Sequence, residues 1–212
     1  MAVGDQQRAL VKALCEAGFE SAAPPASLRI EMLPAEAQAQ VFHLYRALGG
    51  VQDQPALTPT GWDCPLADGL VVELDELQHF NRYRATTLDA AWALQLPWRT
   101  DYLRFCAVYE ADCLRTKGSS EFWSTPKTVS MFGTPAPGAK TLDGVGSPRW
   151  KQRALYDAMR DIAALHGVVR LARVSIFDDV GGTPLGMALS GAVSPDSESL
   201  TELIAQRTAV VS

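Results

Sequence analysis

The sequence predicts a mixed α/β protein in which a central mixed sheet is flanked by helices. The first observation is the segment 60–76, where two short runs meet at Ala67-Asp68-Gly69, a sequence typical of a hairpin turn. The second is a further apolar run at 168–177, which predicts another strand. The third is the recurrence of apolar residues at helical spacing in segments between and around these runs. Strands combined with helices in this way are typical of layered α/β folds.

The boundaries of the helices follow from capping and stop residues. Gly18, Gly49 and Gly167 each follow a periodic apolar segment, as glycines after a helix do. Ser147 followed by Pro148 indicates a helix start, because serine caps the first turn and proline fits its first position. The predicted helices cover residues 5–17, 35–48, 78–95, 98–116, 148–166 and 196–207. We expect 117–147 to be an irregular loop, long enough to serve as a functional flap.

The composition is that of an ordinary globular domain. A chain of 212 residues with 47% apolar residues can bury a substantial core. It contains no apolar run of the length that spans a membrane, and residues 1–15 lack the basic and apolar regions of a signal peptide. The four cysteines, Cys15, Cys64, Cys106 and Cys113, form no Cys-x-x-Cys pair. We therefore expect a cytoplasmic protein with reduced thiols and no membrane partner.

Three carboxylates are expected to meet on one face of the hairpin. A three-residue turn places Asp63 opposite Glu73, and Asp75 lies two residues further along the same face of the strand. Like charges this close repel one another unless a proton or a cation lies among them, and carboxylate oxygens suit Mg²⁺ or Mn²⁺. We therefore expect Asp63, Glu73 and Asp75 to bind Mg²⁺ or Mn²⁺. The alternative is the solvated face of an edge strand.

These residues resemble the motif of the PD-(D/E)XK nuclease superfamily. Asp63 is followed after a ten-residue step by Glu73-Leu74-Asp75 on an apolar strand, and Gln78-His79 after that strand resembles the very-short-patch-repair-like branch. The resemblance covers residues 60–92 directly. Two positions depart from it: Asp75 stands where most members have lysine, and Trp62 replaces the proline before Asp63.

The resemblance implies a restriction-endonuclease-like core of the αβββαβ type. The helix at 148–166 and the strand at 168–177 would complete this core. The chain would then be a single domain over 1–212, with 97–147 as a helical and loop insertion and 178–212 as a C-terminal extension.

The resemblance also implies an enzyme that hydrolyses phosphodiester bonds of nucleic acid, DNA in particular, with Mg²⁺ or Mn²⁺ as cofactor. Asp63, Glu73 and Asp75 would hold the metal and, with Gln78 and His79, form the catalytic set. The residues expected to bind substrate are Arg82, Arg84, Lys151 and Arg153. Such a nuclease would act in DNA repair or defence, as a homodimer or within a larger complex.

A basic segment is consistent with a nucleic-acid partner. Residues 140–173 carry seven Lys and Arg against three acids, in a chain whose net charge is −5. Such a stripe can follow a phosphate backbone, although a solvated helix face has the same composition. Two other functions stay open. One is a catalytically inactive nuclease fold that binds or scaffolds a repair or defence complex, and the other is a metal-dependent hydrolase of a non-nucleic phosphate.

Overall fold

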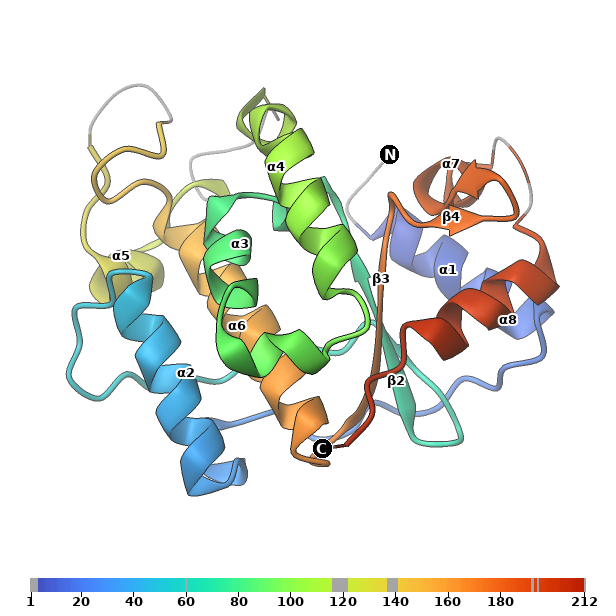
Figure 1. Ribbon diagram of the computed structural model, residues 1–212, viewed down its shortest axis with the longest axis horizontal. Coiled ribbons are helices and arrows are strands. Elements are labelled where there is room, and N and C mark those ends of the chain that lie inside the picture. Colours follow the sequence, from blue (N-terminus) through green and yellow to red (C-terminus); the bar gives the residue numbers. More distant parts are fainter. Residues whose placement is uncertain are drawn as a thin grey trace.

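A three-stranded mixed sheet lies at the centre of the protein (Figure 1). The computed structural model describes residues 4–59, 61–115, 122–136, 141–191, 193 and 195–211. Strands β1 (Cys64–Pro65), β2 (Leu70–Asp75) and β3 (Arg170–Ser175) follow one another in that order, with β1 antiparallel and β3 parallel to β2. The predicted class, a mixed α/β protein with a mixed sheet flanked by helices, is confirmed.

The hairpin has the predicted register. Cys64 pairs with Val72, and two residues closer to the turn Leu66 N donates to Leu70 O at 2.8 Å. Gly69 closes the turn with a φ of 82°, in the left-handed region that glycine adopts without a Cβ clash. This register sets Asp63 opposite Glu73, although β1 itself begins one residue after Asp63.

Two short segments extend the sheet at its edges. Next to β1, an isolated antiparallel bridge joins Ser21 to Leu66, and Ala22 N donates to Pro65 O at 2.9 Å. Next to β3, a second antiparallel bridge joins Ala172 to Thr208. The chain therefore lines both edges of the sheet with backbone from outside the three strands.

Helices cover the two faces of the sheet in separate layers (Figure 1). One layer contains α1 (Asp5–Glu16), α7 (Leu185–Leu189) and α8 (Ser197–Gln206). The other contains α2 (Ala35–Ala47), α3 (Arg82–Leu88), α4 (Arg99–Arg115), α5 (Pro126–Phe132) and α6 (Pro148–Leu165). The remaining elements are the 3₁₀ helices η1 (Ile30–Met32), η2 (Leu77–His79) and η3 (Ala91–Gln95) and the strands β4 (Asp179–Val180) and β5 (Thr183–Pro184).

The alternation of β2 divides the core in two. Leu70, Val72 and Leu74 pack with the layer of α1 and α8, whereas Val71 packs with the layer of α6. Glu73 and Asp75 point to the α6 side, as the two-residue period of a strand requires. The acidic side chains therefore lie between the sheet and α6.

Three regions differ from the sequence predictions. The helix predicted over 78–95 is divided into η2, α3 and η3, because Asn81 caps a new helix by accepting a hydrogen bond from Tyr83 N at 3.1 Å. The predicted loop 117–147 contains α5, whose start is fixed by reciprocal hydrogen bonds between Thr125 and Thr128. Its residues 117–121 and 137–140 lie outside the described part. The tail contains α8 as predicted, but β4, β5 and α7 were missed.

Among the described residues, no helix has the length and apolarity needed to cross a bilayer. The four cysteines all have free sulfurs, three of them buried.

The cap of α6 provides a test of the fold, because the side chain of Ser147 is fully buried. Its hydroxyl donates to Trp123 O at 2.8 Å and accepts from Trp150 N at 3.2 Å. Ser147→Ala leaves both backbone groups without this partner, so we expect a loss of about 1–2 kcal/mol in the free energy of unfolding, measured by urea denaturation. Ser130→Ala, which removes an exposed hydroxyl from α5, should change it by less than about 0.5 kcal/mol. Equal effects would contradict the assigned cap.

Candidate functional site: an acidic hollow at the end of strand β2

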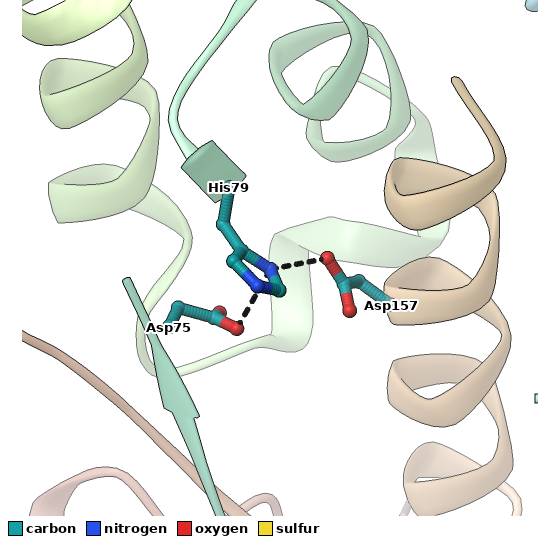
Figure 2. Close-up of side chains that lie close together, drawn as sticks. All are labelled: Asp75, His79 and Asp157. Carbon is teal, nitrogen blue, oxygen red and sulfur yellow. Dashed lines mark hydrogen bonds and ion pairs between the residues drawn. The ribbon is translucent and has the colours of Figure 1, made fainter. Parts of the chain in front are cut away.

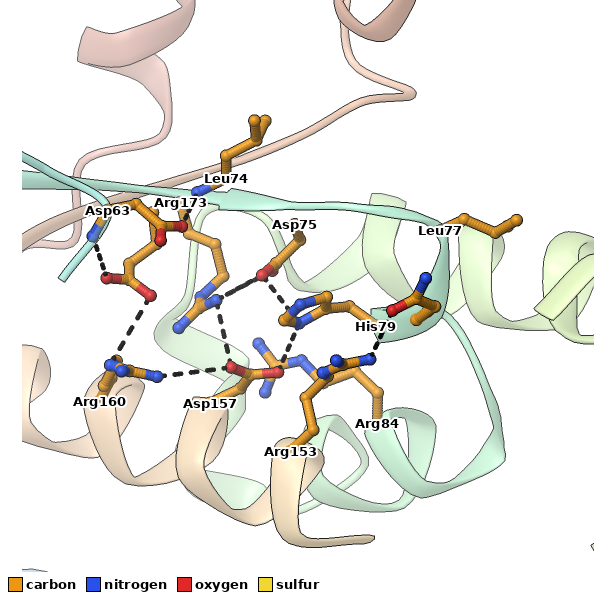
Figure 3. Close-up of polar contacts among 12 residues, drawn as sticks. Asp63, Leu74, Asp75, Leu77, His79, Arg84, Arg153, Asp157, Arg160 and Arg173 are labelled. Carbon is orange, nitrogen blue, oxygen red and sulfur yellow. Dashed lines mark hydrogen bonds and ion pairs between the residues drawn. The ribbon is translucent and has the colours of Figure 1, made fainter. Parts of the chain in front are cut away.

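A hollow of about 350 Å³ opens beside the carboxyl end of β2. Its floor and walls come from the hairpin, from η2 and from the inner face of α6, and α1 contributes at the rim. The residues that line it are Gly4, Gln7, Gly61, Trp62, Asp63, Glu73, Leu74, Glu76, Gln78, His79, Arg153, Asp157 and Arg160. Figure 3 shows that the side chains of Asp63, His79, Asp157 and Arg160 point into the gap between β2 and α6.

Asp63 and Glu73 are held side by side by backbone hydrogen bonds. Asp63 Oδ2 accepts from Leu74 N at 3.0 Å, and Glu73 Oε1 accepts from Asp63 N at 3.2 Å. Gln7 of α1 donates to the carbonyl of Asp63 at 2.8 Å and fixes the chain before β1. On the other side of the hollow, Arg160 Nε of α6 lies 3.6 Å from Glu73 Oε2 (Figure 3).

Burial makes these two carboxyls weaker acids than usual. The pKa of Glu73 is raised to about 7, mainly because burial disfavours the charged form, and the charges of Asp63 and Asp75 add to the shift while Arg160 opposes it. The pKa of Asp63 is also raised, again mainly by burial, although the hydrogen bond from Leu74 N opposes the shift. The lining of the hollow contains more carboxylates than arginines, and such an excess of carboxylate oxygen favours a bound cation.

Asp75 is turned away from this pair and forms a buried ion pair. Arg173 of β3 donates from Nη1 to both carboxylate oxygens of Asp75, at 2.8 and 2.9 Å, and from Nε to Asp161 at 2.9 Å. Arg84 donates to the other oxygen of Asp161 at 2.6 Å. All four side chains have 0–1% exposure. The structure thus brings Asp63 and Glu73 together as predicted, but places Asp75 with Arg173 rather than with them.

His79 links Asp75 to a third carboxylate, Asp157 of α6 (Figure 2). Its Nδ1 lies 3.0 Å from Asp75 Oδ1 and 2.8 Å from Asp157 Oδ2. One ligand atom from each of these three residues lies within 4.8 Å of the others, so their number and type suit a metal ion. However, Arg173 Nη1 lies 3.7 Å from Asp157 and already supplies positive charge there. The geometry therefore favours a polar network that orients the imidazole of His79.

The charges around Asp157 support the interpretation that Asp75, His79 and Asp157 form a polar network. Burial raises its pKa, but the neighbouring His79, Arg173 and Arg84 outweigh burial and lower the pKa overall. Asp157 is therefore an ionised, buried acceptor that holds His79 at the boundary of the hollow, where the imidazole is 19% exposed.

Two further predicted residues lie in the hollow. Gln78 and Arg153 both line it, and Arg153 Nη1 donates to Gln78 Oε1 at 3.1 Å. Burial lowers the pKa of Arg153. Of the predicted catalytic set, Asp63, Glu73, Gln78 and His79 thus surround one space, together with one of the four predicted substrate-binding residues.

The other three predicted substrate-binding residues lie elsewhere. Arg84 has 0% exposure and is paired with Asp161, so it presents no surface to a substrate. Lys151 is 7% exposed and its Nζ lies over the rings of Tyr83 and Phe132, away from the hollow. Arg82 is exposed but forms three side-chain hydrogen bonds with Glu110 of α4. These three residues form internal pairs or pack against rings, and none of them lines the hollow.

The predicted basic stripe is not one continuous surface. Arg173 and Lys151 are buried, and Arg170 pairs with Asp68 at the hairpin turn. Lys140 lies outside the described residues.

Two functional candidates on α6, Asp157 and Arg160, were missed by sequence reasoning. Arg153, Asp157 and Arg160 recur at four and three residues, so they share one face of a helix. This spacing was visible in the sequence, but nothing in it indicated that the face would point at the hairpin rather than at solvent.

Fold and site define a mixed α/β protein with a carboxylate-rich hollow at the end of a buried strand. The family of unknown function DUF7255 matches residues 43–191, more than half of the chain, and the protein belongs to this family. The matched region contains β2, η2, α6 and β3 and therefore nearly every residue of the hollow. No curated protein and no solved structure matches the chain.

The buried ion network gives a prediction about stability. Arg173→Leu leaves Asp75, Asp157 and Asp161 without their shared cation, so we expect the free energy of unfolding at pH 7 to fall by about 3–5 kcal/mol. The deficit should shrink as the pH is lowered, because the stranded carboxylates then take up protons. Arg82→Ala removes the exposed pair with Glu110 and should cost no more than about 1 kcal/mol. If the two variants are equally stable, the network does not stabilise the fold.

A second prediction concerns Glu73 and pH. Its pKa in the folded protein, about 7, lies above the ordinary value of 4.5, so the folded state binds more protons between these values. Its contribution to stability is therefore favourable at low pH and is lost as the pH rises through 7. In EDTA, Glu73→Gln should gain stability relative to the parent between pH 5 and pH 8, by at most about 3 kcal/mol. Thermal melts across this range check the result, with Glu76→Gln as the control for net charge. A stability difference between Glu73→Gln and the parent that does not vary with pH would contradict the raised pKa of Glu73.

Proposed function

We propose that the protein is a metal-dependent phosphodiesterase that cleaves nucleic acid at the acidic hollow. The observation that carries this proposal is the pair Asp63 and Glu73, two carboxylates in register on a hairpin, with the cation Arg160 facing them from α6. This is the combination of hard oxygen ligands and a fixed positive charge that phosphoryl chemistry uses.

The donor set fits Mg²⁺ or Mn²⁺. Asp63 and Glu73 would hold the ion, because both carboxylates line the hollow. Burial raises the pKa of both groups, so a nearby cation would stabilise their charged forms. When bound, such an ion stabilises negative charge on a phosphoryl oxygen and lowers the pKa of water. Asp75 is not assigned to the metal, because Arg173 occupies both of its oxygens.

The remaining residues would bind the phosphate and move a proton. Arg160 would stabilise the developing charge of the phosphoryl group, in the role that the strand lysine has in the PD-(D/E)XK motif that the sequence resembles. His79, oriented by Asp157 and Asp75, would accept or donate a proton at the rim of the hollow. Gln78 would orient the phosphate or a water molecule through its amide, with Arg153 fixing that amide.

The order of elements supports a restriction-endonuclease-like core. Helix α1, the extended segment around Ser21, strands β1 and β2, helix α6 and strand β3 follow one another along the chain, and the four extended segments are neighbours in the sheet. With α2 set aside as an insertion between Ser21 and β1, this sequence of elements is consistent with the αβββαβ order, with α1 on one face of the sheet and α6 on the other (Figure 1). Helices α3, α4 and α5 would then be the insertion between the motif strand and α6.

A second candidate is a nuclease fold that binds nucleic acid without cutting it. The observation that favours it is the replacement of the motif lysine by Asp75, which is committed to a structural ion pair. Under this reading Arg160 would bind phosphate without catalysing its transfer.

The proposal predicts cleavage of single-stranded or plasmid DNA in Mg²⁺ or Mn²⁺ and none in EDTA. Glu73→Gln and Asp63→Asn should each lower the cleavage rate by about 10²-fold or more, because each removes a metal ligand. Arg160→Ala should lower the rate while leaving the metal requirement unchanged. The rates would be measured on labelled oligonucleotides under single-turnover conditions.

Glu202→Gln provides the matched control, because it removes an exposed carboxylate on α8, on the opposite side of the sheet. It should cut at the parent rate. Absence of cleavage by the parent with either metal, combined with retained binding of the oligonucleotide, would reject the nuclease and support the non-catalytic alternative.

A further inference from the structure

A second hollow, of about 270 Å³, adjoins the acidic one and has the opposite charge. The two share His79, Arg153, Asp157 and Arg160, so they meet along the inner face of α6. The other residues that line the second hollow are Thr58, Thr125, Lys127, Arg149, Gln152 and Tyr156. Its lining has four Lys and Arg residues and one carboxylate, that of Asp157, in a protein whose net charge is −5.

Three of these cations have no carboxylate partner. Within the part of the chain that the structure describes, Lys127, Arg149 and Arg153 form no ion pair with an acidic oxygen at 4.0 Å or less. The side-chain hydrogen bonds that Arg149 and Arg153 form go to the neutral amides of Gln152 and Gln78.

The exposed arginines of α4 contrast with them. Arg104 is paired with Asp101, and Arg115 is paired with Asp112. The basic hollow therefore gathers three cations that form no ion pair with a carboxylate of the described residues.

The position of Arg153 is costly unless an anion completes it. Arg153 is half-buried, and burial lowers its pKa despite the nearby charge of Asp157. Tyr156 also lines the hollow, and its buried hydroxyl has no hydrogen-bond partner among the described residues. The guanidinium groups of Arg149 and Arg153 and the ammonium group of Lys127 can only donate hydrogen bonds, and the hydroxyl of Tyr156 can also donate one. This set of donors suits an oxyanion.

The size and position of the hollow indicate which oxyanion. Its volume lies below the roughly 300–1,000 Å³ of typical small-molecule sites, so it suits a charged group of a larger ligand better than a whole cofactor. Arginine forks match phosphate geometry, and the adjoining hollow is the one proposed to hold a reacting phosphodiester.

We propose that the basic hollow binds a phosphate of a nucleic-acid strand whose neighbouring phosphodiester lies in the acidic hollow. The choice of ligand rests on the proposed function, whereas the anion site itself rests on Lys127, Arg149 and Arg153. Phosphate contacts of this kind position a strand without reading its bases, so binding should depend on salt and not on sequence.

The test measures binding in EDTA, where no cleavage occurs. Fluorescence anisotropy of a labelled single-stranded oligonucleotide, and of the matching duplex, would compare the parent with the double variant Lys127→Ala/Arg149→Ala. Both side chains are exposed, so the variant should melt at the parent temperature. We expect at least tenfold weaker binding. The slope of log K against log[salt] should become shallower by about 0.7 for a single strand, because the contact with one phosphate is lost.

Arg104→Ala/Arg115→Ala removes the same number of charges from α4 and should bind like the parent. Equal binding by all three proteins, or equal weakening by both double variants, would overturn the proposal. It would also be overturned if polyglutamate displaced the oligonucleotide as effectively as unlabelled DNA, or if inorganic phosphate bound and no oligonucleotide did.

The outcomes separate the subsite from the proposed activity. An oligonucleotide that binds through Lys127 and Arg149 but is not cut in Mg²⁺ or Mn²⁺ supports the subsite and rejects the nuclease. A parent that cuts DNA, with a Lys127→Ala/Arg149→Ala variant that binds and cuts equally well, rejects the subsite and leaves the nuclease standing.

Discussion

The guanidinium group of Arg173 holds together the three elements on which the site is built. It lies on β3, contacts Asp75 on β2, and contacts Asp157 and Asp161 on α6, in a region without access to water. A buried cation with three acidic neighbours is strongly sensitive to geometry, because any movement that lengthens one contact leaves a charge uncompensated. The spacing between the sheet and α6 is therefore fixed at the point where the hollow opens. This fixed spacing also determines where His79, Asp157 and Arg160 lie.

The same constraint explains why the two acidic groups on β2 have different surroundings. Glu73 and Asp75 point to the same side of the strand, but Asp75 is neutralised by Arg173 whereas Glu73 faces the hollow with Arg160 at a longer distance. One carboxylate is therefore part of the scaffold and the other is available to a ligand. Two residues that lie two positions apart on the strand therefore differ in their access to the hollow.

Local patterns in the sequence predicted most of the longer elements but not the partners of their side chains. The register of the hairpin, the Ser147-Pro148 start of α6 and the strand before Asp178 follow from turn chemistry, capping and periodicity, which act between near neighbours. Asn81 and Thr125 are also local signals, and they mark the helix starts that the coarse periodicity overlooked.

The pairing of Arg173 with Asp75, by contrast, joins residues 98 positions apart, and no local pattern encodes it. For this reason Asp63 and Glu73 were placed together correctly, whereas Arg84 and Lys151, read as surface cations, belong to the core. The sequence shows that Arg153, Asp157 and Arg160 share one face of α6. It does not show that this face points toward the hairpin.

The bridges at the two edges of the sheet have a consequence for where the domain ends. Open strand edges expose unpaired backbone groups that can recruit other chains. Here the segment around Ser21 shields β1 and the segment around Thr208 shields β3, while α1 and α8 cover the apolar face formed by Leu70, Val72 and Leu74. All of these covering segments lie outside the region 43–191 that defines the family. The matched region therefore contains most of the residues that line the acidic hollow, but none of the segments that cover these edges and this face of the sheet.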